Sequence, residues 1–296
     1  MESFSRGWNF LKQAWQMAFK DKDLLKPSIY ALVVGALVSV IGIVPIIGAA
    51  LLFGESSAGN VIMFVLGAIL LFVQFIISYM FSAMTVYLIY GYLSEGDGRM
   101  DKAWAIVKRD FFDIMTLAAV STVVNLLKNA ANKNSKGIGA SIVRAGAGLL
   151  QTLWTEAALL ILPAMVIDDL NLKKGMERIF NITKSNLLLI GISTVGVRWV
   201  TGLIGFILGV IGAVIGFAIG GGAAYASGDP TIIAIGIGVG VLIFFFFVVV
   251  ASVVSSYTST AYHTCLYIWA RDVETAKEKG QSAPVAAPAP LAAVLN

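Results

Sequence analysis

Six stretches of the chain are apolar and almost free of charge, which is typical of helices that cross a membrane. They cover residues 27–53, 60–93, 114–127, 149–167, 187–226 and 231–270. A spanning helix needs about 20 apolar residues, so the short stretch 114–127 is the weakest of the six. The pattern predicts an all-α fold, a polytopic transmembrane bundle of about six spans arranged as three helical hairpins.

Each predicted hairpin follows an amphipathic segment, at residues 4–20, 99–112 and 171–187. In the first segment, Phe4, Trp8, Leu11, Trp15 and Phe19 recur every three or four residues, which places them on one helical face. We expect such a helix to lie in the membrane interface with its basic edge toward anionic lipid. The alternative is a cytosolic helix that packs on the protein itself.

The three amphipathic segments can be aligned column by column. The columns hold a basic residue (Arg6, Lys102, Lys174), a small one (Gly7, Ala103, Gly175), a large apolar one (Trp8, Trp104, Met176) and an aliphatic one (Leu11, Val107, Ile179). The alignment predicts three repeat units, at about 4–98, 99–170 and 171–270, each an interfacial helix followed by a hairpin. The N-terminal interfacial helix occupies 1–26, without the apolar core of a signal peptide, and the transmembrane domain occupies 27–270.

Composition supports the membrane class and excludes several functions. Hydrophobic residues make up 58% of the chain and charged residues 13%, against about 45–50% and 25% in soluble domains. The single histidine and single cysteine, His263 and Cys265, exclude an intrachain disulfide and a His/Cys metal cluster. We therefore expect no metal, no cofactor and no enzyme activity. The net charge of +4 is spread along the chain, which argues against nucleic acid as a partner.

The basic residues predict which side of the membrane each end occupies. Sixteen of the 21 lie before the first span, between spans two and three, between spans four and five, or after span six. The positive-inside rule then places both termini in the cytoplasm of an inner (plasma) membrane protein. Residues 128–144 oppose this assignment, with four basic residues and no acid. Four spans plus a re-entrant hairpin are the alternative. The tail, 271–296, is rich in alanine and proline and is predicted to be disordered.

Glu156 and Arg198 are the only fully charged residues inside the predicted spans. Each lies 12 residues from the inner end of its span, about 18 Å deep at 1.5 Å per residue. Adjacent antiparallel helices would bring them level, so we predict a Glu156–Arg198 pair that Asn125 could join. Buried charges of this kind serve either as a structural pair or as an ion or solute site.

Three further sets of residues are candidates for function. Serines and the histidine form a polar stripe on the last span, suited to a transport pathway or to helix contact: Ser252, Ser255, Ser256, Ser259 and His263. Glycines at four-residue spacing on span five suit close helix packing inside the bundle or in a homodimer: Gly205, Gly209, Gly212, Gly216 and Gly220. Tryptophans are expected to anchor the chain at the membrane interface: Trp8, Trp15, Trp104 and Trp269.

Short motifs resemble a family of uncharacterised prokaryotic integral membrane proteins. They are the opening Phe4-Ser5-Arg6-Gly7-Trp8, the segment Asp21-Lys22-Asp23-Leu24-Leu25, Trp154 with Pro163 and Asp168-Asp169 around span four, and Thr264-Cys265-Leu266-Tyr267 in span six. The segment Gly175-Met176-Glu177-Arg178-Ile179 departs from that family's pattern. The resemblance implies a fold and no catalytic residue. The amphipathic start is also similar, more distantly, to that of CysZ-type sulfate permeases, whose anion-binding residues do not carry over by position.

Two functions follow as expectations. The first is a non-enzymatic membrane scaffold or interaction protein, whose partners are anionic inner-leaflet lipids, other membrane proteins or a second copy of the chain. The second is a channel or permease for a small solute such as an anion, with Arg198 lining the path. A dry, close-packed core around Glu156 favours the scaffold, and a polar cavity that reaches Arg198 favours transport.

Overall fold

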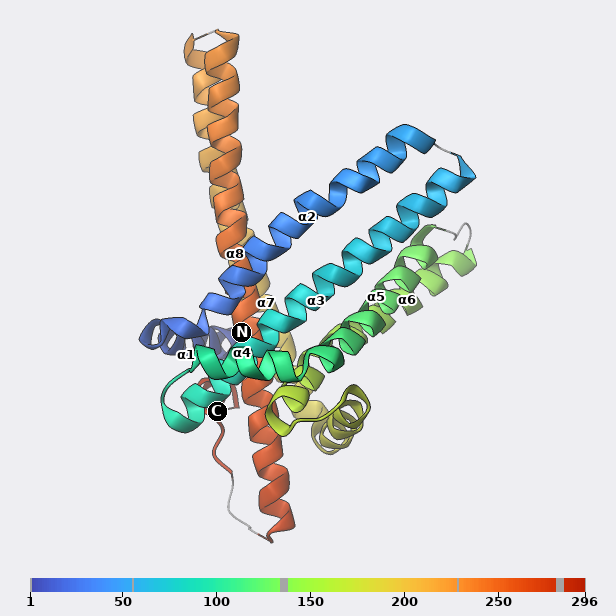
Figure 1. Ribbon diagram of the computed structural model, residues 1–296. Coiled ribbons are helices and arrows are strands. Elements are labelled where there is room, and N and C mark those ends of the chain that lie inside the picture. Colours follow the sequence, from blue (N-terminus) through green and yellow to red (C-terminus); the bar gives the residue numbers. More distant parts are fainter. Residues whose placement is uncertain (1, 55, 134–137, 228, 281–284, 296) are drawn as a thin grey trace.

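The computed structural model describes the backbone of residues 2–54, 56–133, 138–227, 229–280 and 285–295. Within these ranges it describes the side chains of all residues except 2–4, 133, 138–140, 183–199, 223–227 and 295. The described chain is all-α (Figure 1). Its elements, in order, are α1 (Glu2–Lys20), the 3-10 turn η1 (Lys22–Leu24), α2 (Lys26–Phe53), α3 (Ser57–Glu95), α4 (Met100–Arg109), α5 (Phe111–Lys133), α6 (Ile138–Asp168), α7 (Leu172–Ser227), α8 (Pro230–Glu278) and α9 (Ala289–Leu295).

Within the described ranges, six helices are long and apolar enough to cross a membrane, as expected of a multi-pass membrane protein. They pair as the hairpins α2–α3, α5–α6 and α7–α8 (Figure 1). The weakest predicted span is a full helix, because α5 carries a crossing-length stretch over Phe111–Asn132. The prediction of an all-α polytopic bundle with six candidate spans is therefore confirmed.

Local sequence explains where two of the hairpins turn. At the first tip Gly54 ends α2 with a positive φ of 54°, and the hydroxyl of Ser56 caps α3 by accepting a hydrogen bond from the Gly59 amide at 3.1 Å. At the third tip the Asp229 carboxylate accepts from the Thr231 amide at 2.7 Å, and Pro230 occupies the first position of α8. Each tip therefore carries its own helix-start signal.

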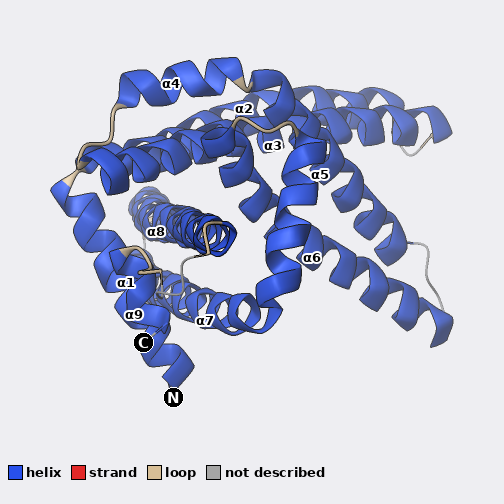
Figure 2. Cartoon of the chain, turned by 90° about the horizontal axis from the view of Figure 1, so that it is seen from below, coloured by secondary structure: helices blue, strands red, loops and turns tan. Residues whose placement is uncertain are grey.

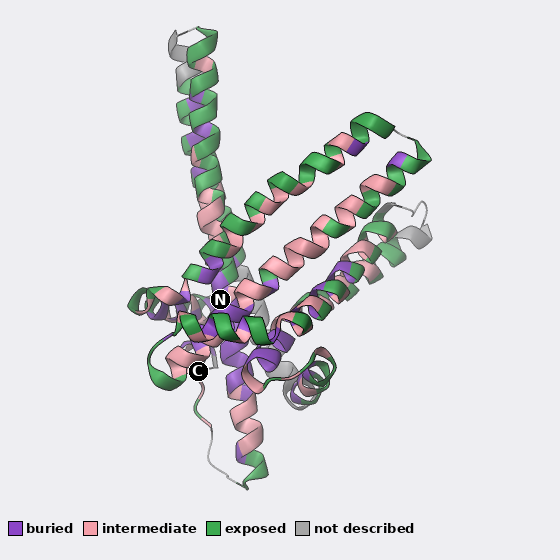
Figure 3. Cartoon of the chain, in the orientation of Figure 1, coloured by how far each residue is buried: buried purple, intermediate pink, exposed green. Residues whose placement is uncertain are grey.

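The buried residues gather at the end opposite the tips, in a region that we call the base. The base consists of residues 79–89 of α3, 158–166 of α6 and 257–270 of α8, together with α1, α4, α9 and the first turns of α5 and α7. Viewed along α8, this helix stands at the centre with α1, α4, α6 and α7 around it (Figure 2). The outer halves of the hairpins are largely exposed (Figure 3). The packed core of the protein is thus the base.

The helix ends differ from the pattern of the sequence in two places. α7 is one continuous helix from Leu172 to Ser227, so the third amphipathic segment and span five form a single helix. The prediction of disorder from residue 271 onward is wrong for the described part of the tail. Instead α8 continues to Glu278, and α9 packs against α1 with Leu291 and Val294 buried. These two apolar side chains anchor the proline-rich tail in the buried core.

Candidate functional site

A carboxylate and an imidazole meet where α6 passes α8. The Nε2 atom of His263 lies 3.2 Å from Oε2 of Glu156. The other ring nitrogen, Nδ1, lies 2.7 Å from the backbone carbonyl oxygen of Ser259, and the ring of Tyr262 meets the imidazole edge to face at 5.2 Å. His263 is only 3% exposed. The imidazole is therefore held from both nitrogens and one side.

This arrangement can hold a proton. A carbonyl oxygen only accepts hydrogen bonds, so the contact with Ser259 requires a hydrogen on Nδ1 of His263. The contact between Nε2 and Glu156 then requires a further proton, carried either by the imidazole or by the carboxyl group. Sequence reasoning missed this pair, although both residues had been singled out separately. The missing signal was the relative depth of α6 and α8.

The predicted partner of Glu156 falls outside the described side chains. Arg198 lies on α7 within the stretch 183–199. Asn125, the third member of the predicted group, instead accepts a hydrogen bond from Nδ2 of Asn129 at 3.3 Å, one turn further along α5. Glu156 and Asn125 are thus bonded to different neighbours.

The predicted polar stripe on α8 divides between two environments. Ser259 and His263 belong to the base, where Ser259 supplies the carbonyl that holds the imidazole. Ser252 and Ser256 line a cavity of about 400 Å³ between α8 and the α2–α3 hairpin, whereas Ser255 does not line it. The stripe therefore does not form one continuous path along α8.

A buried hydroxyl joins three helices on the membrane side of the base. Ser121 Oγ of α5 lies 2.8 Å from the hydroxyl of Tyr79 on α3 and accepts a hydrogen bond from Nε1 of Trp154 on α6, also at 2.8 Å. Hydrogen bonds of this kind hold helices together inside membranes. The sequence gives Ser121 no distinguishing signal, because only the fold shows that its hydroxyl, and not that of the adjacent Thr122, meets α3 and α6.

Two consecutive acids at the end of α6 bond to neighbouring helices of the base. Asp168 accepts hydrogen bonds from the hydroxyl of Tyr267 and from Arg271 Nη1, both on α8, the latter at 3.2 Å. Asp169 pairs with Nε of Arg109 at 3.2 Å, at the end of α4. The adjacent acids therefore attach α6 to two different helices.

The guanidinium of Arg109 also holds the residue that ends α4. Its Nε and Nη2 atoms donate to the carboxylate of Asp110 at 2.6 and 2.9 Å. Burial raises the pKa of Asp110 above its usual value, and the hydrogen bonds from Arg109 oppose part of that rise. The charge of Asp110 thus depends on its neighbour for stabilisation.

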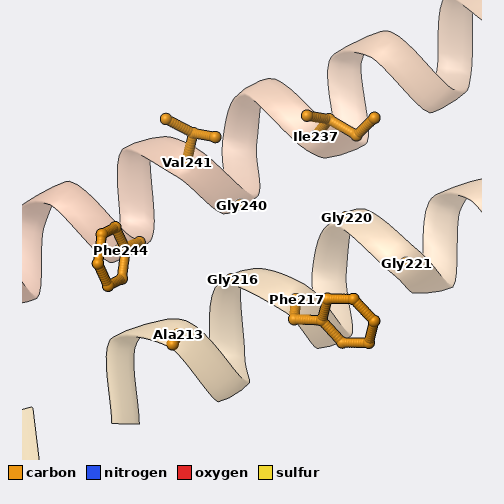
Figure 4. Close-up of a pocket in the computed structure, with 9 residues that line it drawn as sticks. All are labelled: Ala213, Gly216, Phe217, Gly220, Gly221, Ile237, Gly240, Val241 and Phe244. Atoms are coloured by element: carbon orange, nitrogen blue, oxygen red, sulfur yellow. The ribbon is translucent and has the colours of Figure 1, made fainter. Parts of the chain in front are cut away.

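Three of the five predicted packing glycines contact α8 within the same chain. Gly216 faces Gly240 so closely that a Cβ on either would collide with the other's carbonyl oxygen (Figure 4). Gly220 lies opposite Gly236. A Cβ on Gly212 would lie 2.7 Å from Cβ of Phe247. A Cβ on Gly205 or Gly209 would meet nothing within 4 Å among the described residues. The close approach therefore joins α7 to α8.

The four predicted interface tryptophans fall into two groups. Trp8 and Trp104 are exposed, at 48% and 41%. Trp15 donates from Nε1 to the hydroxyl of Thr258 at 3.2 Å, and Trp269 donates to the carbonyl of Val285 at 3.3 Å. Trp15 and Trp269 therefore form hydrogen bonds within the protein.

The aligned columns of the three amphipathic segments have similar environments. The small residues Gly7, Ala103 and Gly175 are all buried, and the large apolar residues that follow them are all exposed. A Cβ on Gly175 would lie 3.2 Å from Cγ2 of Ile161, a tight contact that favours a small residue there. In α1 the face toward the protein is centred on Phe10, Ala14 and Ala18, which lie beside the stripe that we expected to face the membrane interface.

Among the described residues, no group of three or more His, Cys, Asp and Glu side chains could hold a metal ion. The candidate site consists of the Glu156–His263 pair and the polar contacts around it. No protein-family model and no curated protein matches the chain.

Proposed function

We propose that this chain is a non-enzymatic scaffold of a bacterial-type inner membrane, which organises lipids or other membrane proteins around it. The observation that carries the proposal is the division of the molecule into a close-packed base and hairpins with uncovered faces (Figure 3). A protein that moves a solute through its own spans needs a lined path. A scaffold needs a rigid frame with free helical surfaces.

The surroundings of Glu156 support the scaffold. Its partner His263 is 3% exposed and meets the fully buried ring of Tyr262, and the Glu156 side chain itself is 22% exposed. Three cavities of about 390 to 510 Å³ are lined by residues of the described ranges, and neither Glu156 nor His263 lines any of them. The polar pair thus resembles a structural contact at the edge of the packed base more than a solute site.

The helices around the base supply the lipid-facing surface of the scaffold. Trp8, Trp104 and Met176 occupy the same aligned column and are all exposed. The Nζ atom of Lys108 lies 5.9 Å from the ring centre of Trp104, which pairs a cation with an exposed aromatic ring. An apolar side chain flanked by a cation suits the boundary of an anionic leaflet. We assign that leaflet to the cytoplasmic side, with both termini inside.

A permease for a small solute is the second candidate. The observation that favours it is the cavity between α8 and the α2–α3 hairpin, which is lined by hydroxyl and amide side chains within the apolar part of the chain. If this cavity were half of a path, flux would depend on the charged residue that could complete it, Arg198.

Flux measurements distinguish the two functions. Purified protein in liposomes of phosphatidylethanolamine and phosphatidylglycerol should pass radiolabelled sulfate and chloride no faster than protein-free liposomes do. The Arg198→Gln variant should give the same background. Protein-dependent flux that this substitution abolishes would refute the scaffold and establish the permease.

The orientation has a separate test. A cysteine placed at Lys133, in a Cys265→Ser background, should react with an impermeant maleimide added outside intact cells, because it lies at the tip of the α5–α6 hairpin. A cysteine in place of Lys108 should stay unlabelled until the cells are opened. Labelling of Lys108→Cys in intact cells would contradict cytoplasmic termini.

A further inference from the structure

The cavity between α8 and the α2–α3 hairpin has a polar end and an apolar end, and we call it the serine groove. Its volume is about 400 Å³, within the range of small-molecule sites. Its polar lining comes from Ser28, Gln74, Ser78, Ser252 and Ser256. The described side chains that line it include no charged group, so a ligand would meet neutral hydrogen-bonding groups and hydrocarbon.

The polar end lies next to the base. Ser28 is in the first turn of α2, and Ser78 and Ser256 directly precede Tyr79 and Tyr257, the first buried residues of the base on their helices. Gly35 lies seven residues beyond Ser28, about 10 Å further from the base at 1.5 Å per residue. Hydroxyl groups therefore concentrate at the level where a spanning helix enters the membrane.

The apolar end extends toward the tips. Leu32 and Ala36 of α2 face Phe245 and Val249 of α8 across this part of the groove. Gln74 crosses from α3 to α2, where its Nε2 atom donates to the Gly35 carbonyl and the Ser39 hydroxyl, both at 2.8 Å. The amide of Gln74 is thus used to join the two helices.

Three hydroxyls of the groove have no hydrogen bond within the described part of the chain. Ser28 is the decisive one, because it is only 4% exposed and lines the cavity. Ser78 and Ser256 are exposed and also lack a partner there, whereas Ser252 donates to the Val248 carbonyl at 2.8 Å. The hydroxyls of Ser28, Ser78 and Ser256 are therefore free to donate to an acceptor bound in the cavity.

We propose that the serine groove binds one glycerophospholipid from the leaflet at the base. Its ester carbonyl oxygens accept hydrogen bonds from Ser28, Ser78 and Ser256, and one acyl chain lies between Leu32 and Phe245. The ester region is uncharged and lies at the depth of the serines, and the chain continues in the direction of the apolar walls. The inference requires only that α2, α3 and α8 cross the membrane, so it is independent of the scaffold role.

Photo-crosslinking of the full chain in nanodiscs tests the proposal. The discs contain phosphatidylethanolamine and phosphatidylglycerol, with a trace of phosphatidylethanolamine that carries a diazirine on one acyl chain. Peptide mapping should show the highest labelling at residues 28–36 and 245–256, above that of the α7–α8 tip. Uniform labelling of all lipid-facing helices, or a crosslink to a second copy of the chain in place of lipid, would overturn the proposal.

Two adjacent serines provide the matched variants. Ser256→Leu fills the groove and should lower labelling of the α2 peptide about fivefold, which corresponds to about 1 kcal/mol. Ser255→Leu adds the same side chain outside the groove and should leave labelling at the wild-type level. Equal labelling of the α2 peptide in both variants would contradict a groove site.

A third comparison isolates the hydrogen bonds. The same probe with ether linkages lacks the carbonyl oxygens and should label the groove about fivefold less than the ester lipid. Ser256→Ala, which removes the hydroxyl without filling space, should reduce this preference for the ester. Equal labelling by ester and ether lipids would rule out recognition by the serines.

Discussion

The base and the outer halves of the hairpins are built in different ways. In the base, side chains from distant parts of the sequence pack and hydrogen-bond with one another, as when Tyr257 donates to the carbonyl of Ala14 at 3.0 Å. In the outer halves, a helix mainly contacts its own hairpin partner, and the α7–α8 hairpin stands apart from the other two (Figure 1). Tertiary structure is therefore specified at one end, and the other end offers its surface to the membrane.

The difference suggests a division of labour between side-chain chemistry and backbone approach. Buried tyrosines, threonines and charged pairs fix which helices meet in the base. Along α7 and α8 the two helices are held together by a close backbone approach, which is possible because Gly216 and Gly240 have no side chains. Substitutions in the two regions should consequently change the free energy of unfolding by different amounts.

The largest expected effect comes from removing buried volume in the base. Leu88 is fully buried, so Leu88→Ala should lower the free energy of unfolding by about 2–5 kcal/mol through lost packing and a residual cavity. Leu51 is 82% exposed near the first tip, and Leu51→Ala should change stability by less than about 0.5 kcal/mol. Reversible unfolding in mixed detergent micelles measures both. Equal losses would abolish the distinction between the regions.

A smaller effect should follow from adding volume at the glycine crossing. Gly216→Val introduces a side chain against the Gly240 backbone, and we expect a loss of about 1–3 kcal/mol. Gly209→Val is the matched control, because a Cβ there meets no described atom within 4 Å. The same unfolding assay applies. Tolerance of Gly216→Val would mean that α7 and α8 do not cross at this point.

The smallest expected effect on stability comes from a hydrogen bond between helices, at the place where the base joins the outer halves of the hairpins. Ser121→Ala removes the acceptor used by Trp154 and the partner of Tyr79. Hydrogen bonds between membrane helices average about 0.6 kcal/mol, with a maximum near 1.7 kcal/mol, so we expect a loss in that range together with a shift in Trp154 fluorescence. Thr116→Ala, at an exposed position of the same helix, should produce neither change.

The sequence predicted the helices well and their mutual contacts less well. Hydrophobic stretches and glycine spacing depend on local composition, and they located the six spans and the glycines at 212, 216 and 220. The contact between Glu156 and His263 depends on how far α8 extends into the base, which no local pattern encodes. Ser121 and Ser28 could not be singled out, because the helices that their hydroxyl groups face are decided by tertiary packing.

The central position of α8 has a consequence for the order of assembly. Trp15 and Tyr257 anchor the first helix to the last span across 243 residues in both hydrogen bonds. A ribosome delivers the chain from its amino end, so the first helix emerges long before its binding surface has been made. The hairpins α2–α3 and α5–α6 therefore enter the bilayer before the core of the base is complete. The closing event of folding is then the insertion of the final span, and truncation before that span should leave the earlier segments open to quality-control proteases.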